Sequence, residues 1–517
     1  MIKLVRKVRD SVKNLNIYNF NKFMYLAVGI YVGTICLFFF GLDFARKEFC
    51  LNYVPMIVLL PVGIIFCFGL WELLDKTLGN SRRIVYYILF LMLSIQMIAV
   101  SQYYFYTDWD VTYLIELSQQ ISHQGNIGEY TEYFSQYPNN LFLAYIYSTL
   151  MRLVHLLGYH DMEYLTLLWL QCVLNSLTGL IVFEIICELF NVRKAIWGFV
   201  VYCLLVGMSP WVSIPYSDSM GLIVPSLIFL IYVKRTSFRN MFIPWFNMAF
   251  LAFVGYKIKP QIVIVFIAII IISVSTIKKE SWSLLVRQCI TGIVAGLIVA
   301  SIICGLVIKS TGIKVNPDRT FHMQHFLMMG LNTETMGVWS EDDVSYSGWC
   351  ATSEERNAAD LKRAKERAID LGLNGIMLQY SRKTLTNYYD GTFGWGGEGY
   401  FYFRIREDNE NVVGQFFRNL YYNREYMGKN YQAWSNFQQM LWVAVLALGV
   451  IGIAKKKNAT KRKEISVILL SLVGITLFVT LFEARARYIY TYVPFYIIIA
   501  NVGLVEISCR MELMKEK

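Results

Sequence analysis

The sequence has little charge and lacks several common signatures of soluble enzymes. Only 16% of its 517 residues are charged, whereas soluble proteins average about 25%. It contains no P-loop for nucleotides and no CxxC pair for zinc or haem. Its residues are 56% hydrophobic and its mean hydropathy is +0.44. This composition predicts a polytopic membrane protein.

The ten cysteines also lack a paired spacing, and most lie inside apolar runs. They are therefore interpreted as small apolar residues, with no disulfide framework. The formal net charge of +11 comes from short basic clusters between apolar runs. That distribution is typical of membrane proteins, so no nucleic-acid partner is expected.

The apolar runs predict an all-α membrane protein with about twelve transmembrane helices, at roughly 20 residues per crossing. The expected spans are 23–41, 53–71, 84–101, 163–189, 195–208, 218–233, 241–256, 260–277, 284–309, 436–454, 465–481 and 488–507. They divide the chain into an N-terminal membrane module (1–309) with an outer acidic loop (102–160), an extracellular region (310–435) and C-terminal membrane helices (436–517).

The basic clusters between these runs predict the orientation. Lys and Arg are enriched in cytoplasmic loops, so both termini are expected in the cytoplasm. The acidic loop and the region 310–435 then lie outside the cell, the latter as a small, partly helical layer. The apolar stretch 137–157 would invert the later helices if it crossed, so it is interpreted as a helix along the outer surface.

Two carboxylates, Asp108 and Asp110, closely follow the apolar run from Ile84 to Val100. Ionisable groups at the membrane boundary are candidates for function. One of them could act as a general base on an acceptor hydroxyl, or the two could bind Mg²⁺ or Mn²⁺ through oxygen ligands. The alternative is a solvated helix end.

Two outer turns carry cations where the orientation rule does not predict them. Arg485 and Arg487 follow Glu483 near one outer helix end, and Lys257 and Lys259 occupy a second turn. Guanidinium and ammonium groups match phosphate oxygens, so both turns are candidates for binding an anionic substrate. The alternative is contact with lipid headgroups.

Three further polar residues lie at expected outer helix ends. His322 and His325 follow the span 284–309 and could bind phosphate, share a proton or ligate a metal. Asp218 could bind substrate or cap the next helix. For all three, a purely structural role is the alternative.

Together, these motifs resemble the GT-C superfamily of integral membrane glycosyltransferases, in particular bacterial members of the protein mannosyltransferase and arabinosyltransferase-like branch. The matching segments are Asp108-Trp109-Asp110, Tyr133-Phe134, Tyr137-Pro138-Asn139-Asn140, Pro215-Tyr216-Ser217-Asp218 and Glu483-Ala484-Arg485-Ala486-Arg487-Tyr488. The chain departs from many relatives in having two spans, not one, before the helix that leads to the acidic loop.

The resemblance implies a sugar donor linked to polyprenyl phosphate, used at the outer face of the plasma membrane. Asp108 would match the catalytic acidic position, with Asp110 as the alternative, and Arg485 and Arg487 would match positions that hold the donor phosphate. The expected acceptor is a cell-envelope glycan, a teichoic acid or a lipid. A polysaccharide polymerase or ligase using lipid-diphosphate glycans, and a lipid or glycan transporter, are the alternative functions.

Overall fold

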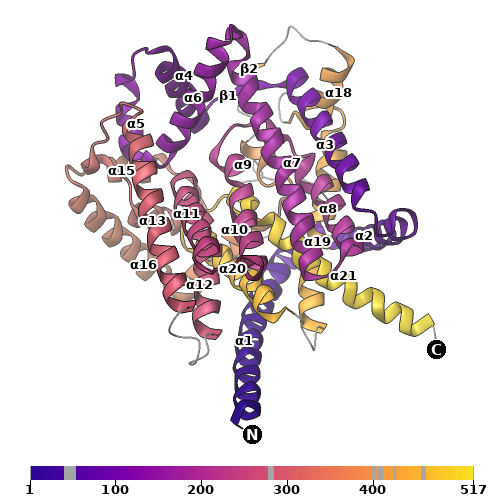
Figure 1. The fold of residues 1–517 in the computed structure, drawn as a ribbon. Coiled ribbons are helices and arrows are strands. Elements are labelled where there is room, and N and C mark those ends of the chain that lie inside the picture. Colours follow the sequence, from indigo (N-terminus) through magenta and orange to yellow (C-terminus); the bar gives the residue numbers. More distant parts are fainter. Residues whose placement is uncertain are drawn as a thin grey trace.

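The computed structural model is almost entirely helical and describes residues 2–39, 54–276, 285–398, 402–405, 411–423, 427–455 and 461–515. It confirms an all-α fold with several membrane-spanning helices (Figure 1). In the described part, the strands are β1 (Phe105–Thr107) and β2 (Tyr402–Ile405), which pair in antiparallel fashion.

Within the described residues, seven helices are long and apolar enough to cross a membrane. The qualifying segments are Asn16–Phe38 in α1 (Ile2–Phe38), α2 (Met56–Leu78), α3 (Arg82–Tyr103), His160–Leu189 around α7 (Glu163–Leu189), Val286–Lys309 in α13 (Leu285–Lys309), α19 (Tyr431–Lys455) and α20 (Arg462–Leu481). Further helices complete the bundle: α8 (Val192–Tyr202), α9 (Ser217–Gly221), α10 (Ile223–Val233), α11 (Phe242–Ile258), α12 (Ile264–Thr276) and α21 (Val493–Lys515). The count of about twelve spans stays a prediction.

Ion pairs bring the basic helix ends together on one face of the bundle. Arg193 lies 3.0 Å from Asp75, Arg82 lies 3.5 Å from Glu184, and Lys234 lies 3.4 Å from the same glutamate. These contacts join the ends of α2, α3, α7, α8 and α10, as the charge pattern predicts. The N-terminal end of α1 projects from one end of the molecule, and β1, α4 and α6 lie at the other (Figure 1). Which of the two faces is cytoplasmic stays a prediction.

The layer around β1 combines the acidic loop with the region after residue 310. Its helices are α4 (Asp110–His123), α5 (Thr131–Gln136), α6 (Leu141–Leu156), α14 (Met323–Gly330), α15 (Glu341–Gly348), α16 (Ser353–Tyr388), α17 (Trp395–Glu398) and α18 (Val412–Tyr421). The stretch 137–157 forms α6, which packs against α4 and is not among the candidate spans. Because β2 pairs with β1, the later region fixes the strand that leads into Asp108 and Asp110.

Candidate functional site

The residue between the two carboxylates has a strained backbone. Trp109 has φ 114° and ψ −161°, a region that is almost exclusive to glycine. Its indole N–H donates to the Thr107 hydroxyl at 2.8 Å. The Thr112 hydroxyl donates to the carbonyl of Thr107 at 2.6 Å. These bonds hold the sharp turn between β1 and α4.

The turn gives the two carboxylates different surroundings. Asp108 is exposed, and its Oδ1 accepts the backbone N–H of Trp109 at 2.9 Å. Asp110 is half-buried at the start of α4, and its Oδ2 accepts the hydroxyl of Tyr216 at 3.1 Å. Asp108 is therefore open to an incoming molecule, whereas Asp110 is held inside the protein.

Tyrosines surround Asp110. Burial raises the pKa of Tyr133 and of Tyr216, and the carboxylate of Asp110 raises both further because it disfavours a second negative charge. The side chain of Asn140 donates to the Tyr216 hydroxyl at 3.3 Å. The tyrosines stay protonated at neutral pH, and the hydroxyl of Tyr216 thereby fixes the orientation of Asp110.

Arg487 comes from the distant turn before α21 and packs onto the acidic loop. Its guanidinium carbon lies 4.4 Å from the ring centroid of Trp109 and 5.3 Å from that of Tyr216. Its Nε lies 3.9 Å from Asp218, which also forms a close ion pair with Lys259. Arg487, Asp218 and Lys259 are all buried, so their charges act in a medium that screens them weakly.

The neighbouring residues of the same turn extend this polar cluster. Glu483 lies 3.3 Å from Arg485 and accepts the hydroxyl of Tyr488 at 2.9 Å. The Lys259 ammonium lies 4.5 Å from the ring centroid of Tyr488. Lys257, in contrast, lies over the rings of Phe253 and Tyr256 on its own helix. Lys259, Arg485 and Arg487 therefore gather here, and Lys257 does not.

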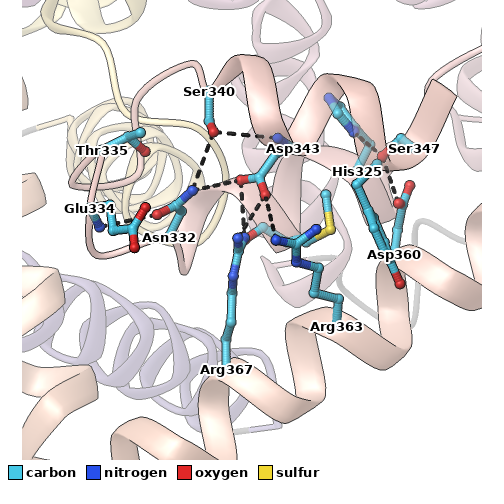
Figure 2. Close-up of polar contacts among 12 residues, drawn as sticks. His325, Asn332, Glu334, Thr335, Ser340, Asp343, Ser347, Asp360, Arg363 and Arg367 are labelled. Carbon is cyan, nitrogen blue, oxygen red and sulfur yellow. Dashed lines mark hydrogen bonds and ion pairs between the residues drawn. The ribbon is translucent and has the colours of Figure 1, made fainter. Parts of the chain in front are cut away.

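A buried polar network in the layer around β1 is centred on Asp343 (Figure 2). Asp343 accepts from Arg367 at 2.6 Å and from Asn332 at 2.9 Å. The carbonyl of Asn332 accepts the N–H of Gly337 at 2.8 Å, and the carbonyl of Gly337 accepts the N–H of Ala484 at 2.7 Å. This chain of bonds fixes the backbone between Glu483 and Arg485.

The approach of the two segments requires glycine at position 330. A Cβ added there would lie 2.5 Å from the carbonyl oxygen of Leu481 and 2.8 Å from that of Phe482. Lys383 of α16 fills the adjacent space and donates to the carbonyls of Thr480 and Phe482, both at 2.6 Å. Sequence reasoning missed Lys383, because nothing in its local pattern distinguishes it from the surface lysines of the same helix.

The two predicted histidines, His322 and His325, lie at the start of α14 and not in the cluster around Arg487. His325 is fully buried, stacks on Phe321 with ring centroids 4.3 Å apart, and lies 2.7 Å from the Ser347 hydroxyl. His322 is exposed and lies 3.3 Å from the Ser353 hydroxyl. Phe321 in turn packs edge-on against Tyr137, so this phenylalanine links His325 to that tyrosine.

Metal binding by the acidic pair stays a prediction. In the part of the chain that the structure describes, neither Asp108 nor Asp110 belongs to a group of three or more close metal-binding side chains. Such a group is formed by His123, His155 and Glu163 instead. Sequence reasoning missed it, because the three residues come from three different helices, α4, α6 and α7.

An apolar pocket of about 290 Å³ lies among α1, α2, α19, α20 and α21. Its polar edge is formed by Tyr388, whose hydroxyl lies 2.7 Å from that of Thr476 and 2.9 Å from that of Tyr496. Tyr388 and Lys383 are five residues apart on α16, roughly 7.5 Å along the helix. The same helix therefore joins the pocket to the turn that carries Glu483.

Comparison with known proteins gives a family but no activity. A family model described as "Conserved hypothetical integral membrane protein" matches residues 19–506. No curated protein matches the chain.

Proposed function

The chain belongs to this family of integral membrane proteins, and on that premise we propose that it is a membrane glycosyltransferase. It moves a sugar from a polyprenyl-phosphate donor to a cell-envelope glycan, teichoic acid or lipid at the outer face of the plasma membrane. One observation carries the proposal. The guanidinium carbon of the buried Arg487, from the C-terminal part of the chain, lies 4.4 Å from the ring centroid of Trp109. Trp109 is the residue between Asp108 and Asp110.

The donor phosphate binds at the cluster of Arg487, Arg485 and Lys259. Arginine matches phosphate oxygens with two parallel hydrogen bonds, and lysine adds a point charge. Both kinds of cation lie next to the acidic loop, so a phosphate held here places its sugar close to Asp108. As the sugar leaves, the same cations stabilise the charge that develops on the phosphate.

Asp108 acts as the general base because it is the exposed member of the pair. It takes the proton of the acceptor hydroxyl as the acceptor oxygen forms its bond to the sugar carbon. The bond from that carbon to the phosphate oxygen breaks, and polyprenyl phosphate leaves with the bonding electrons. Asp110, fixed by Tyr216, positions the loop and need not exchange a proton.

The apolar pocket supports a lipid-linked donor. It lies among membrane-spanning helices, and its apolar lining is suited to binding an isoprenoid chain. Thr476, at its edge, precedes Glu483 by seven residues, so a lipid tail in the pocket can carry its phosphate to the polar cluster.

The test uses purified protein in lipid with radiolabelled polyprenyl-phosphate sugars. Wild type is expected to release polyprenyl phosphate, whereas Asp108→Asn loses activity by roughly 10²- to 10⁴-fold, the usual contribution of a general base. Arg487→Lys, which keeps the charge but loses the fork, should raise the donor KM. Asp342→Asn changes another exposed outer aspartate and should retain activity.

A folded wild-type protein with no turnover across a panel of donors would contradict the proposal and favour the polymerase or transporter. Full activity of Asp108→Asn would remove Asp108 from the mechanism and move the test to Asp110→Asn.

A further inference from the structure

Three of the five histidines of the chain gather away from the polar cluster described above. His123 ends α4, His155 lies in the last turn of α6, and His160 lies in the short turn before α7. Glu163 is the first residue of α7. Side chains from three helices and one turn therefore meet at one point.

The distances between their polar atoms are short. Nε2 of His123 lies 2.7 Å from Oε1 of Glu163, and Nδ1 of His155 lies 3.3 Å from the same oxygen. Nδ1 of His160 lies 2.8 Å from Nδ1 of His155. The ligand atoms of His123, His155 and Glu163 all lie within 4.8 Å of one another.

The 3.3 Å separation of His155 from Glu163 matches the coordination shell of a small cation. Ligand atoms 2.0–2.1 Å from a tetrahedral zinc ion lie roughly 3.3 Å from one another. Two imidazole nitrogens and one carboxylate oxygen also form a common ligand set of zinc and of other first-row transition metals. Among these contacts, those of His123 with Glu163 and of His155 with His160 are hydrogen bonds, whereas His155 faces Glu163 as an ion-pair contact.

Burial gives a second, independent reason. Glu163 is only 5% exposed, and a buried carboxylate needs a compensating charge. In the described part of the chain, its ion-pair partners are His123 and His155, with no lysine or arginine. Both histidines are about half-exposed, so a metal ion can enter from the surface.

We infer that His123, His155 and Glu163 form a binding site for a divalent first-row transition-metal ion, with zinc as the expected occupant. His160 lies beside His155 and can complete the shell or orient that ring. The ion joins the ends of α4 and α6 to the start of α7. Because α4 begins at Asp110, the ion braces the helix that follows the turn of Asp108 and Asp110, and the site is independent of the proposed transferase activity.

The experiment measures zinc binding to the full-length protein, purified in lipid with a tag that contains no histidine. After incubation with zinc and removal of free ion, elemental analysis should find about one equivalent per chain. Competition with a chromogenic chelator gives the affinity. Glu163→Gln and His155→Gln each remove a ligand and are expected to lower that affinity by roughly 100-fold or more. His322→Gln, an exposed histidine outside the group, should bind as wild type does.

Two further readouts separate a lost ligand from a misfolded variant. X-ray absorption of the zinc-loaded wild type should show nitrogen and oxygen neighbours at about 2.0–2.1 Å. Zinc should raise the Tm of wild type but not that of Glu163→Gln. A wild-type protein that retains less than about a tenth of an equivalent of zinc per chain overturns the site. This result does not depend on the folding of any variant. Variants that bind zinc with wild-type affinity overturn it as well.

Discussion

Trp109 occupies a backbone region that costs a non-glycine residue about 1–3 kcal/mol. The conformation persists because its side chain is fixed on several sides. The indole donates to Thr107, packs edge-on against Tyr216 with ring centroids 5.0 Å apart, and lies under Arg487. Strain of this kind gathers at functional sites. This conformation turns Asp108 outward and Asp110 inward, so the two carboxylates have different surroundings.

Tyr216→Phe tests the orientation of Asp110. The substitution keeps the ring near Arg487 but removes the hydroxyl that donates to Asp110. Because hydrogen bonds to charged groups contribute about 1.5–3 kcal/mol, we expect a lower Tm and a kcat reduced by about tenfold, equivalent to about 1.4 kcal/mol of barrier. Thermal unfolding and the transferase assay measure these changes.

Tyr147→Phe is the matched control, because Tyr147 is also fully buried and its hydroxyl has no hydrogen-bond partner within the described residues. It should leave both quantities nearly unchanged. Equal effects of the two substitutions would mean that the Tyr216 hydroxyl does not act through Asp110.

His325 predicts a pH dependence of the layer around β1. Burial lowers the pKa of His325 to about 4, from 6.5. Below pH 6.5 the unfolded chain therefore binds a proton that the folded layer does not, and stability falls as the pH falls. Between pH 7 and 5 the loss is roughly 2 kcal/mol. Hydrogen exchange of α14 and α15 at the two pH values measures it.

His325→Gln should remove this dependence, and His322→Gln should keep it. Asp360 also faces Ser347. Burial raises the pKa of Asp360, so protonation of this carboxylate raises the stability of the folded state as the pH falls. This contribution is opposite to that of His325 and would remain in both variants. A dependence that survives in His325→Gln would assign it to groups other than the histidine.

At the scale of elements, the layer around β1 braces the turn that holds the proposed phosphate site. Asp343 is fully buried and is held mainly by Arg367. Arg367→Ala leaves this charge with Arg363 at 3.9 Å, and breaking a buried pair costs about 3–5 kcal/mol. We expect faster hydrogen exchange at residues 330–340 and 482–486, together with a raised donor KM.

Lys362→Ala, on the exposed side of the same helix, is the control and should change neither quantity. Faster exchange at 330–340 without any change at 482–486 would show that the network does not support the turn.

Local patterns predict much of the fold but not the meeting of distant segments. The basic clusters predict that the helix ends near Arg82, Arg193 and Lys234 lie on one face, and ion pairs join these ends in the structure. Such clusters can be recognised from nearby sequence alone. The start of α16 also follows a local pattern, a capping box formed by Thr352 and Glu355. The packing of Arg487 on Trp109 and the group around Glu163 depend on three-dimensional contacts between remote helices, which no spacing rule contains.

At the scale of the whole molecule, the structure separates a face of paired basic helix ends from a face of carboxylates, cations and aromatic rings. The apolar pocket lies among the helices that join the two faces and meets the second face through α16. A donor with a charged head and a long apolar tail matches this arrangement, whereas a soluble sugar nucleotide would leave the pocket unused.

Gly33→Leu tests whether the pocket holds the donor tail. Gly33 lines the pocket, and a Cβ added there meets no atom within 4 Å, so the larger side chain fills the cavity without a clash at its base. We expect an unchanged Tm and a KM raised about tenfold, or about 1.4 kcal/mol, for a long-chain polyprenyl-phosphate donor, with little change for a short-chain analogue. Gly69→Leu is the control, because Gly69 of α2 has equal space but lies outside the pocket lining. If Gly33→Leu leaves the long-chain KM unchanged, or raises both values equally, the tail binds elsewhere and the pocket belongs to ordinary membrane lipid.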